Sequence, residues 1–139
     1  MATSVVLLVE DEAMVLLDIE GALIEAGFDV IAVTNATKAL AEFDRDTSRI
    51  NAVVTDIRLG SGTNGWELAR DIRGAVPTMP IIYLSGDGAL DWHAEGVPDS
   101  IMISKPCVMV QIITALATLP NQQVPIARRT PRPGGRDAG

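Results

Sequence analysis

Residues 5–12 read VVLLVEDE, five consecutive apolar residues followed at once by three acidic ones. An apolar run of this length without polar alternation is typical of a strand buried on both faces of a sheet. Downstream, apolar residues recur at helical spacing on one face, and Gly27 follows as a C-terminal cap; the face comprises Val15, Ile19, Ala22, Leu23 and Ala26. A buried strand that leads directly into such a helix predicts a β–α repeat.

Four more apolar runs of strand length follow, at residues 30–33, 52–55, 81–84 and 101–104. Helical patterns separate them, beginning with one that Asn35 can cap. Five alternating strands and helices predict a doubly wound α/β fold with a parallel sheet covered on both faces.

The sequence also predicts the lengths of the last two helices. The segment 86–100 contains three glycines and Pro98, so we expect only a short fourth helix, at about Leu90–Glu95. The last helix is predicted over Val108–Leu119, with Pro120 ending it.

Composition and charge narrow the function. The chain has 139 residues, 47% hydrophobic and 21% charged, with a formal charge of −7 and a single cysteine. Its acidic residues concentrate in 1–119, which argues against nucleic-acid binding, and no apolar run is long enough for a membrane span. We therefore predict one domain over 1–119, a Pro/Gly/Arg-rich tail over 120–139 and a cytoplasmic location, because one cysteine excludes an internal disulfide and fits a reducing compartment.

Polar residues stand at the predicted carboxyl ends of several strands: Glu10, Asp11, Asp56, Ser85 and Lys105. In open α/β sheets this edge binds ligands. Three carboxylates brought together repel one another, and a hard cation such as Mg²⁺ relieves the conflict. A carboxylate beside Mg²⁺ is also a nucleophile toward a phosphoryl donor, with lysine and serine side chains available to the phosphoryl oxygens.

Each of these residues also has an ordinary explanation. Glu10 and Asp11 could cap the first helix, Asp56 could be a turn residue, and Lys105 could simply precede the last helix. The joint occurrence of all of them at successive strand ends favours the functional interpretation.

The motifs together resemble the receiver domain of two-component response regulators over residues 5 to about 119. The matching stretches are VVLLVEDE (5–12), VVTDIRL (53–59) with Gly65, IYLSG (82–86) and SKP (104–106). The resemblance implies a flavodoxin-like sheet of order 2-1-3-4-5. It also implies a phosphoacceptor at Asp56 and Mg²⁺ held by Asp11, by Asp56, by Glu10 through water and by the backbone carbonyl of Arg58. The phosphoryl-binding and switch residues would be Ser85, Gly86 and Lys105.

Several positions depart from the receiver pattern. Gly60 replaces the usual proline, and the loop to Gly65 is one residue longer than is common. Met102 stands where receivers carry a switch aromatic, and Cys107 replaces the aromatic after Lys-Pro. The stretch 80–88 is similar to the motif of single-domain FAT GUY receivers, which also lack the switch aromatic and have a reduced fourth helix.

The resemblance predicts a signalling module rather than an enzyme, one that catalyses only its own phosphotransfer and dephosphorylation. Its partners would be a sensor histidine kinase or phosphotransfer protein and a downstream protein target. The charge-free last helix suggests a homodimer; no nucleic acid or membrane is implied. Two alternatives stay open: a degenerate receiver that binds partners without phosphorylation, and an aspartate-dependent phosphatase, which would need an acid where Arg58 stands.

The remaining aromatic residues have two interpretations. Trp66 and Trp92 either face a partner or pack against loops, and His93 is expected at the surface.

Overall fold

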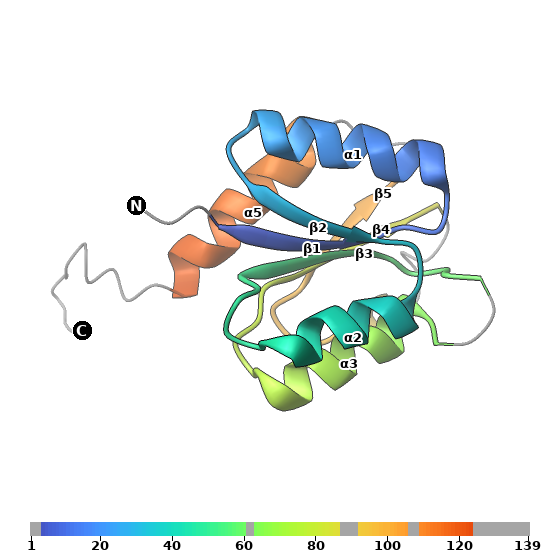
Figure 1. Ribbon diagram of the computed structural model, residues 1–139. Helices are drawn as coiled ribbons and strands as arrows, with labels where there is room; N and C mark the ends of the chain where they lie inside the picture. The colour runs from blue at the N-terminus through green and yellow to red at the C-terminus, as the bar shows by residue number, and fades with distance from the viewer. Residues whose placement is uncertain (1–3, 61–62, 87–91, 106–108, 124–139) are drawn as a thin grey trace, which may run out of the picture.

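The computed structural model describes residues 4–60, 63–86, 92–105 and 109–123, and they form one parallel sheet flanked by helices (Figure 1). The sheet has the order β2-β1-β3-β4-β5, so the predicted fold is confirmed. Its strands are β1 (Val5–Val9), β2 (Asp29–Val33), β3 (Ala52–Asp56), β4 (Ile81–Ser85) and β5 (Ile101–Ser104).

Five helices connect or follow the strands: α1 (Ala13–Glu25), α2 (Ala36–Arg45), α3 (Gly65–Ala75), α4 (Trp92–Glu95) and α5 (Met109–Gln123). The fourth is short, as predicted; its described part is Trp92–Glu95, and residues 90 and 91 of the predicted helix lie outside the described residues. The prediction that Pro120 ends the last helix was wrong, because α5 continues to Gln123. Proline has a helical φ and can therefore lie within α5, but it removes the backbone hydrogen bond that residue 120 would donate.

Each face of the sheet carries its own apolar core. Successive strand residues point to opposite faces, so Leu7 and Val9 join the core under α2 and α3, whereas Val6 and Leu8 join the core under α1 and α5. Figure 1 shows α1 and the α2–α3 pair on opposite sides of the strands. Burial on both faces explains why the strands read as uninterrupted apolar runs.

Local signals fix where the helices begin and end. Gly27 has a positive φ of 102° after the last turn of α1, a conformation that favours glycine. Asn35 caps α2 by accepting the Lys38 N–H, and Asn64 forms a reciprocal capping box with Glu67 at the start of α3. The described helices include none long and apolar enough to cross a membrane.

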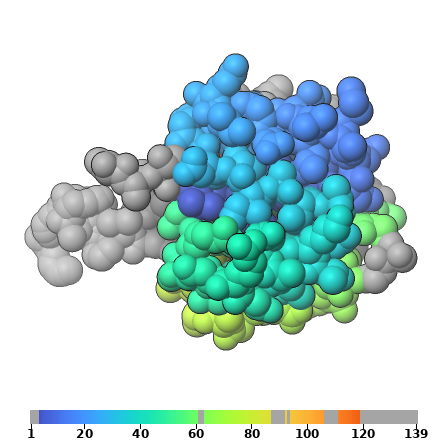
Figure 2. All heavy atoms as spheres, viewed as in Figure 1, coloured from blue at the N-terminus to red at the C-terminus, as the bar shows by residue number. Residues whose placement is uncertain are grey.

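At the β2 edge, the strand side chains of residues 30–33 are half-buried. Figure 2 shows atoms of α1, β2 and α2 meeting in one continuous surface over this edge. The acidic residues lie elsewhere, at the carboxyl ends of β1 and β3.

Candidate functional site

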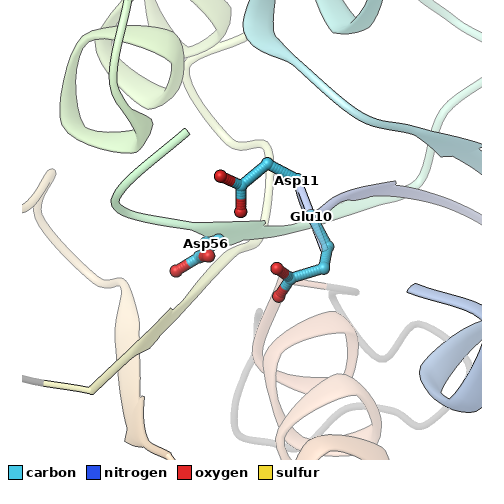
Figure 3. A group of neighbouring side chains, drawn as sticks. All are labelled: Glu10, Asp11 and Asp56. Atoms are coloured by element: carbon cyan, nitrogen blue, oxygen red, sulfur yellow. The ribbon is translucent and has the colours of Figure 1, made fainter. Parts of the chain in front are cut away.

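Three carboxylates converge at the carboxyl ends of β1 and β3. Glu10 and Asp11 follow β1 directly, and Asp56 is the last residue of β3. The two strands are neighbours in register, with Val9 opposite Thr55, so their ends coincide. One carboxylate oxygen of each acid lies within 4.8 Å of the other two, and Figure 3 shows the three side chains around a common space. The sequence prediction that these acids meet at one sheet edge holds in the structure.

Lys105 places a positive charge against two of these acids. Its Nζ donates to Glu10 Oε1 at 2.9 Å and to Asp56 Oδ2 at 3.2 Å. Glu10 is fully buried and Asp56 is 7% exposed. One ammonium group faces three carboxylates, so the cluster keeps surplus negative charge when all of them are ionised.

Burial raises the pKa of Glu10 above its ordinary value, although hydrogen bonds from Lys105 and the Glu12 amide oppose the shift. Burial likewise raises the pKa of Asp56, and the nearby Asp11 charge adds to it while Lys105 opposes it. Burial disfavours the Lys105 ammonium, but the hydrogen bond to Glu10 and the charge of Asp56 outweigh it, so the pKa of Lys105 is raised. The carboxylates thus ionise at a cost that a further cation would relieve.

Ser85, Gly86 and Arg58, the other predicted site residues, lie at or just after the carboxyl ends of β4 and β3. Ser85 is buried at the end of β4, and its carbonyl accepts the Lys105 N–H at 2.7 Å, which fixes the start of the Lys105 segment beside β4. Gly86 follows Ser85, and a Cβ there would meet no atom within 4 Å. Arg58 is exposed two residues after Asp56. Their predicted roles remain predictions.

The connection between β3 and α3 packs tightly behind Asp56. A Cβ on Gly65 would lie 2.4 Å from the Asp56 carbonyl oxygen and 2.8 Å from the Ile57 Cα. The Gly65 N–H also donates to the Ile57 carbonyl at 2.8 Å. Only glycine allows this close backbone approach, which sets the position of Asp56.

The same loop opens a depression beside Asp11. Gly60 has a φ of +78°, which the proline usual in receivers could not adopt, and a Cβ there would lie 4.0 Å from Asp11 Oδ2. A cavity of about 370 Å³ lies here, lined by Asp11, Asn35, Ala36, Thr37, Leu59, Gly60 and Thr63. The cluster is therefore open to incoming groups on the Asp11 side.

The donor set fits a hard divalent cation. The converging ligand atoms are all carboxylate oxygens, and Asp11 is exposed, so waters can complete an oxygen coordination shell as Mg²⁺ prefers. The surplus negative charge adds a thermodynamic reason for a cation to bind. Glu10 would reach it least directly, because its two oxygens already accept from Lys105 and from the Glu12 N–H.

The sequence left open whether Trp66 and Trp92 face a partner or pack within the domain. Trp66 is buried, and its ring lies 4.6 Å from that of Tyr83, centroid to centroid. Trp92 donates from its indole N–H to Ser100 Oγ at 3.0 Å. Both tryptophans therefore pack within the domain.

Sequence reasoning missed the Tyr83 contacts, because nothing in the local pattern distinguishes Tyr83 from other buried strand residues. The His93 side chain, Cys107, and residues 87–88 of the FAT GUY stretch lie outside the described residues.

Met102 is half-buried beside Tyr83 in the β4–β5 register. It packs against the core under α2 and α3. The position where receivers carry a switch aromatic is thus filled here by a flexible aliphatic side chain.

Comparison with known proteins agrees with this architecture. Residues 6–117 match the family model described as response regulator receiver domain. A response regulator receiver protein from Sinorhizobium medicae is 45% identical, with a TM-score of 0.82 over 86% of this chain and 95% of that one. A receiver domain protein from Clostridium thermocellum is 26% identical, with a TM-score of 0.78 over 86% of this chain and 96% of that one.

Curated relatives are longer proteins. The C4-dicarboxylate transport transcriptional regulatory protein DctD of Rhizobium meliloti is 35% identical over 58% of this chain and 17% of its own length. The phyllosphere-induced regulator PhyR of Methylorubrum extorquens is 24% identical over 76% of this chain and 39% of its own length. The chain thus spans less than half the length of each of these two.

Proposed function

Because this chain belongs to the response regulator receiver family, we propose that Asp56 is its phosphoacceptor and that a phosphohistidine on a sensor histidine kinase or phosphotransfer protein is the donor. The observation that carries the proposal is the position of Asp56. It ends a buried strand, lies within reach of two further carboxylates, and has one oxygen held by Lys105. Phosphoryl acceptance on an aspartate is general for receivers, and the carboxylates and Lys105 around Asp56 support assigning it to this aspartate.

The reaction would proceed by in-line displacement at phosphorus. A carboxylate oxygen of Asp56 forms the new P–O bond while the P–N bond of the phosphohistidine breaks, so Asp56 becomes an acyl phosphate and the imidazole leaves. Lys105 lies 3.2 Å from Asp56 Oδ2 and would pair with a phosphoryl oxygen, and the Ser85 hydroxyl would donate to another. Asp11, Asp56, Glu10 and the Arg58 carbonyl would hold Mg²⁺. The bound ion would offset negative charge on the transferred group.

A signalling role follows from the absence of a second catalytic acid. A phosphatase using Asp56 as nucleophile would need an acid on the leaving group, but Arg58 stands two residues on. Hydrolysis of the acyl phosphate returns Asp56 to its starting state, so the chain would catalyse only its own phosphorylation and dephosphorylation. A downstream protein partner in the cytoplasm would read the phosphorylated state.

The outer face of α1 is suited to docking the donor. Met14, Leu17 and Ile24 are 74%, 61% and 54% exposed, and they are the large hydrophobic residues that the described structure leaves exposed. Their spacing of three and seven residues forms one stripe, as in helix–helix contacts. Since α1 begins two residues after Asp11, a donor helix on this stripe would lie beside the acidic cluster.

The outer face of α5 fits a homodimer only weakly. Ile112, Ala115 and Leu116 are buried against the sheet, while Gln111, Thr114, Ala117 and Thr118 are exposed. This face is uncharged and made of small or polar side chains. We retain the α5 homodimer as a proposal, tested by sedimentation with and without beryllofluoride; a monomer under both conditions at high protein concentration would overturn it.

Phosphorylation chemistry tests the central proposal. The protein is incubated with acetyl phosphate and Mg²⁺, and the acyl phosphate is quantified by intact mass. Modification should be lost in Asp56→Asn and on chelating Mg²⁺, and retained in Asp44→Asn, which changes an exposed aspartate on α2. Modification of Asp56→Asn at the wild-type level would overturn the assignment, and no modification of the wild type would favour a degenerate receiver.

Docking is tested separately. Leu17→Glu should slow transfer from a phosphorylated histidine kinase by about tenfold or more, the effect of losing roughly 1.4 kcal/mol of binding. Transfer from acetyl phosphate should be unchanged, because the small donor needs no docking surface. Equal losses with both donors would instead mean that the substitution damages the site.

A further inference from the structure

The segment from Glu95 to Ser100, between α4 and β5, is fastened to α3 by two arginines. Arg73 Nη1 donates to the Pro98 carbonyl at 2.6 Å, and Arg70 Nη1 donates to the Glu95 carbonyl at 3.0 Å. The described part of α4 is a single turn that ends at Glu95. The segment after it is not helical, and the two arginine bonds connect it to α3.

Val97 is the point at which this segment meets the core. It is 7% exposed, and side chains bond both of its backbone groups. Its N–H donates to the Tyr83 hydroxyl at 3.1 Å, and its carbonyl accepts from Ser100 Oγ at 2.6 Å. Ser100 in turn accepts from the indole N–H of Trp92.

Tyr83 connects this point to the strand that ends at Ser85. It is fully buried on β4, and its ring packs against Trp66 in the first turn of α3. Tyr83 and Ser85 are two residues apart on one strand, so they lie on the same face of the sheet. A shift of the end of β4 that included Tyr83 would change the distance between its hydroxyl and the Val97 N–H.

The neighbouring strand has no aromatic ring for this purpose. Met102 pairs with Tyr83 across β4 and β5, and its thioether sulfur is only a weak acceptor for a backbone N–H. A buried N–H is costly to leave without an acceptor, so loss of the Tyr83–Val97 bond would weaken the attachment of the segment to β4 while its bonds to α3 remain.

We propose that the hydrogen bond between Tyr83 and Val97 couples the phosphoryl state of Asp56 to the segment 95–100. When Ser85 moves to bind a phosphoryl oxygen, the end of β4 carries Tyr83 away from Val97 and the bond weakens. The segment, still bonded to α3, then becomes more mobile on its β4 side and accessible to a partner. This inference rests on the proposed function, because it takes the phosphoryl group on Asp56 as its trigger.

Hydrogen exchange of the Val97 amide, followed by NMR, tests the coupling with Mg²⁺ alone and with Mg²⁺ and beryllofluoride. In the wild type, beryllofluoride should speed exchange by about tenfold, the scale of one lost hydrogen bond. In Tyr83→Phe, which keeps the ring, exchange should already be fast and respond little, while the ¹⁹F signal of bound beryllofluoride persists. Ser100→Ala leaves the Tyr83 acceptor in place and should keep the wild-type response.

The outcomes separate the two hypotheses. Bound beryllofluoride with unchanged Val97 exchange in the wild type overturns the coupling and leaves the phosphoacceptor assignment standing. A full response in Tyr83→Phe, or its loss in Ser100→Ala, also overturns the coupling, because the segment would then respond without depending on Tyr83. Failure of beryllofluoride to bind the wild type overturns the phosphoacceptor assignment and the coupling with it.

Discussion

At the ends of β1 and β3 the buried ionisable side chains are carboxylates, Glu10 and Asp56, whereas around β4 and β5 the buried polar side chains are hydroxyls, those of Tyr83, Ser85 and Ser100. The first region carries raised carboxyl pKa values and surplus negative charge. In the second, Tyr83 and Ser100 hydroxyls bond the backbone of Val97. Buried charge without full compensation costs free energy that a bound cation can relieve, while hydrogen-bonded neutral groups fix a conformation. We call the acidic ends of β1 and β3 the charged region, where phosphorylation is proposed. The hydroxyl contacts around β4 and β5 are the neutral region, which is proposed to respond to it.

The largest effect on stability is expected at Gly65, which packs against Asp56 and precedes Trp66, the residue that contacts Tyr83. In Gly65→Ala the new Cβ would collide with the backbone of Asp56 and Ile57, so the free energy of unfolding should fall by on the order of 3 kcal/mol or more. Urea denaturation measures it. The control is Gly21→Ala, in an exposed position of α1 with no atom within 4 Å of the new Cβ, which should stabilise by about 0.5–1 kcal/mol. Equal effects would mean that the backbone behind Asp56 is not tightly packed.

The next largest loss of stability is expected in the neutral region, at Tyr83. Tyr83→Phe leaves the buried Val97 N–H without its acceptor, which should lower the free energy of unfolding by about 1–2 kcal/mol. The ring still packs against Trp66, so the fold should be retained. Acetyl phosphate should modify the variant as it does the wild type. A loss of phosphorylation together with stability would show that the two regions are not separable.

The sequence predicts the charged region better than the neutral one, and the reason is physical. Apolar runs reveal buried parallel strands, and the carboxyl ends of such strands must share an edge, so the meeting of Asp11 with Asp56 follows from topology. The double contact of Lys105 with Glu10 and Asp56 depends on where a flexible side chain settles. No local pattern determines that position.

The contacts of the neutral region are long-range packing events. Tyr83 meets Val97 fourteen residues later in the chain, and no periodicity indicates this pair. The short α4 was predictable from its glycines, but the bonds that replace it, from Arg73 to Pro98 among them, were not. At α5, Pro120 predicts the end of the helix, but the helix continues to Gln123.

A smaller and opposite effect is expected from Asp56→Asn. The pKa of Asp56 is raised in the folded state by burial, so at acidic pH the carboxyl is protonated in both states and the substitution should change little. As pH rises through the raised pKa, the wild type must ionise a buried group and loses stability. With divalent cations chelated, the variant should therefore be more stable at neutral pH by on the order of 1 kcal/mol. Urea denaturation at both pH values measures the difference.

Two further conditions sharpen this test. Asp44→Asn changes an exposed aspartate and should show no such pH-dependent gain. Added Mg²⁺ should stabilise the wild type more than Asp56→Asn, because the variant lacks one carboxylate ligand. A variant that is less stable than the wild type at neutral pH without metal would show that the Lys105 contact outweighs burial, and that the charged region is already balanced.

The smallest effect on stability is expected at the exposed ion pair that borders the neutral region. Arg70 and Glu95 form an ion pair at 3.3 Å, with each side chain 47% exposed. Water replaces such contacts readily, so Arg70→Gln should change the free energy of unfolding by less than about 0.5 kcal/mol. A double-mutant cycle with Glu95→Gln isolates the pair. A coupling well above 1 kcal/mol would mean that the Arg70–Glu95 ion pair is a main attachment of the segment. Loss of the Tyr83–Val97 bond alone would then not mobilise it.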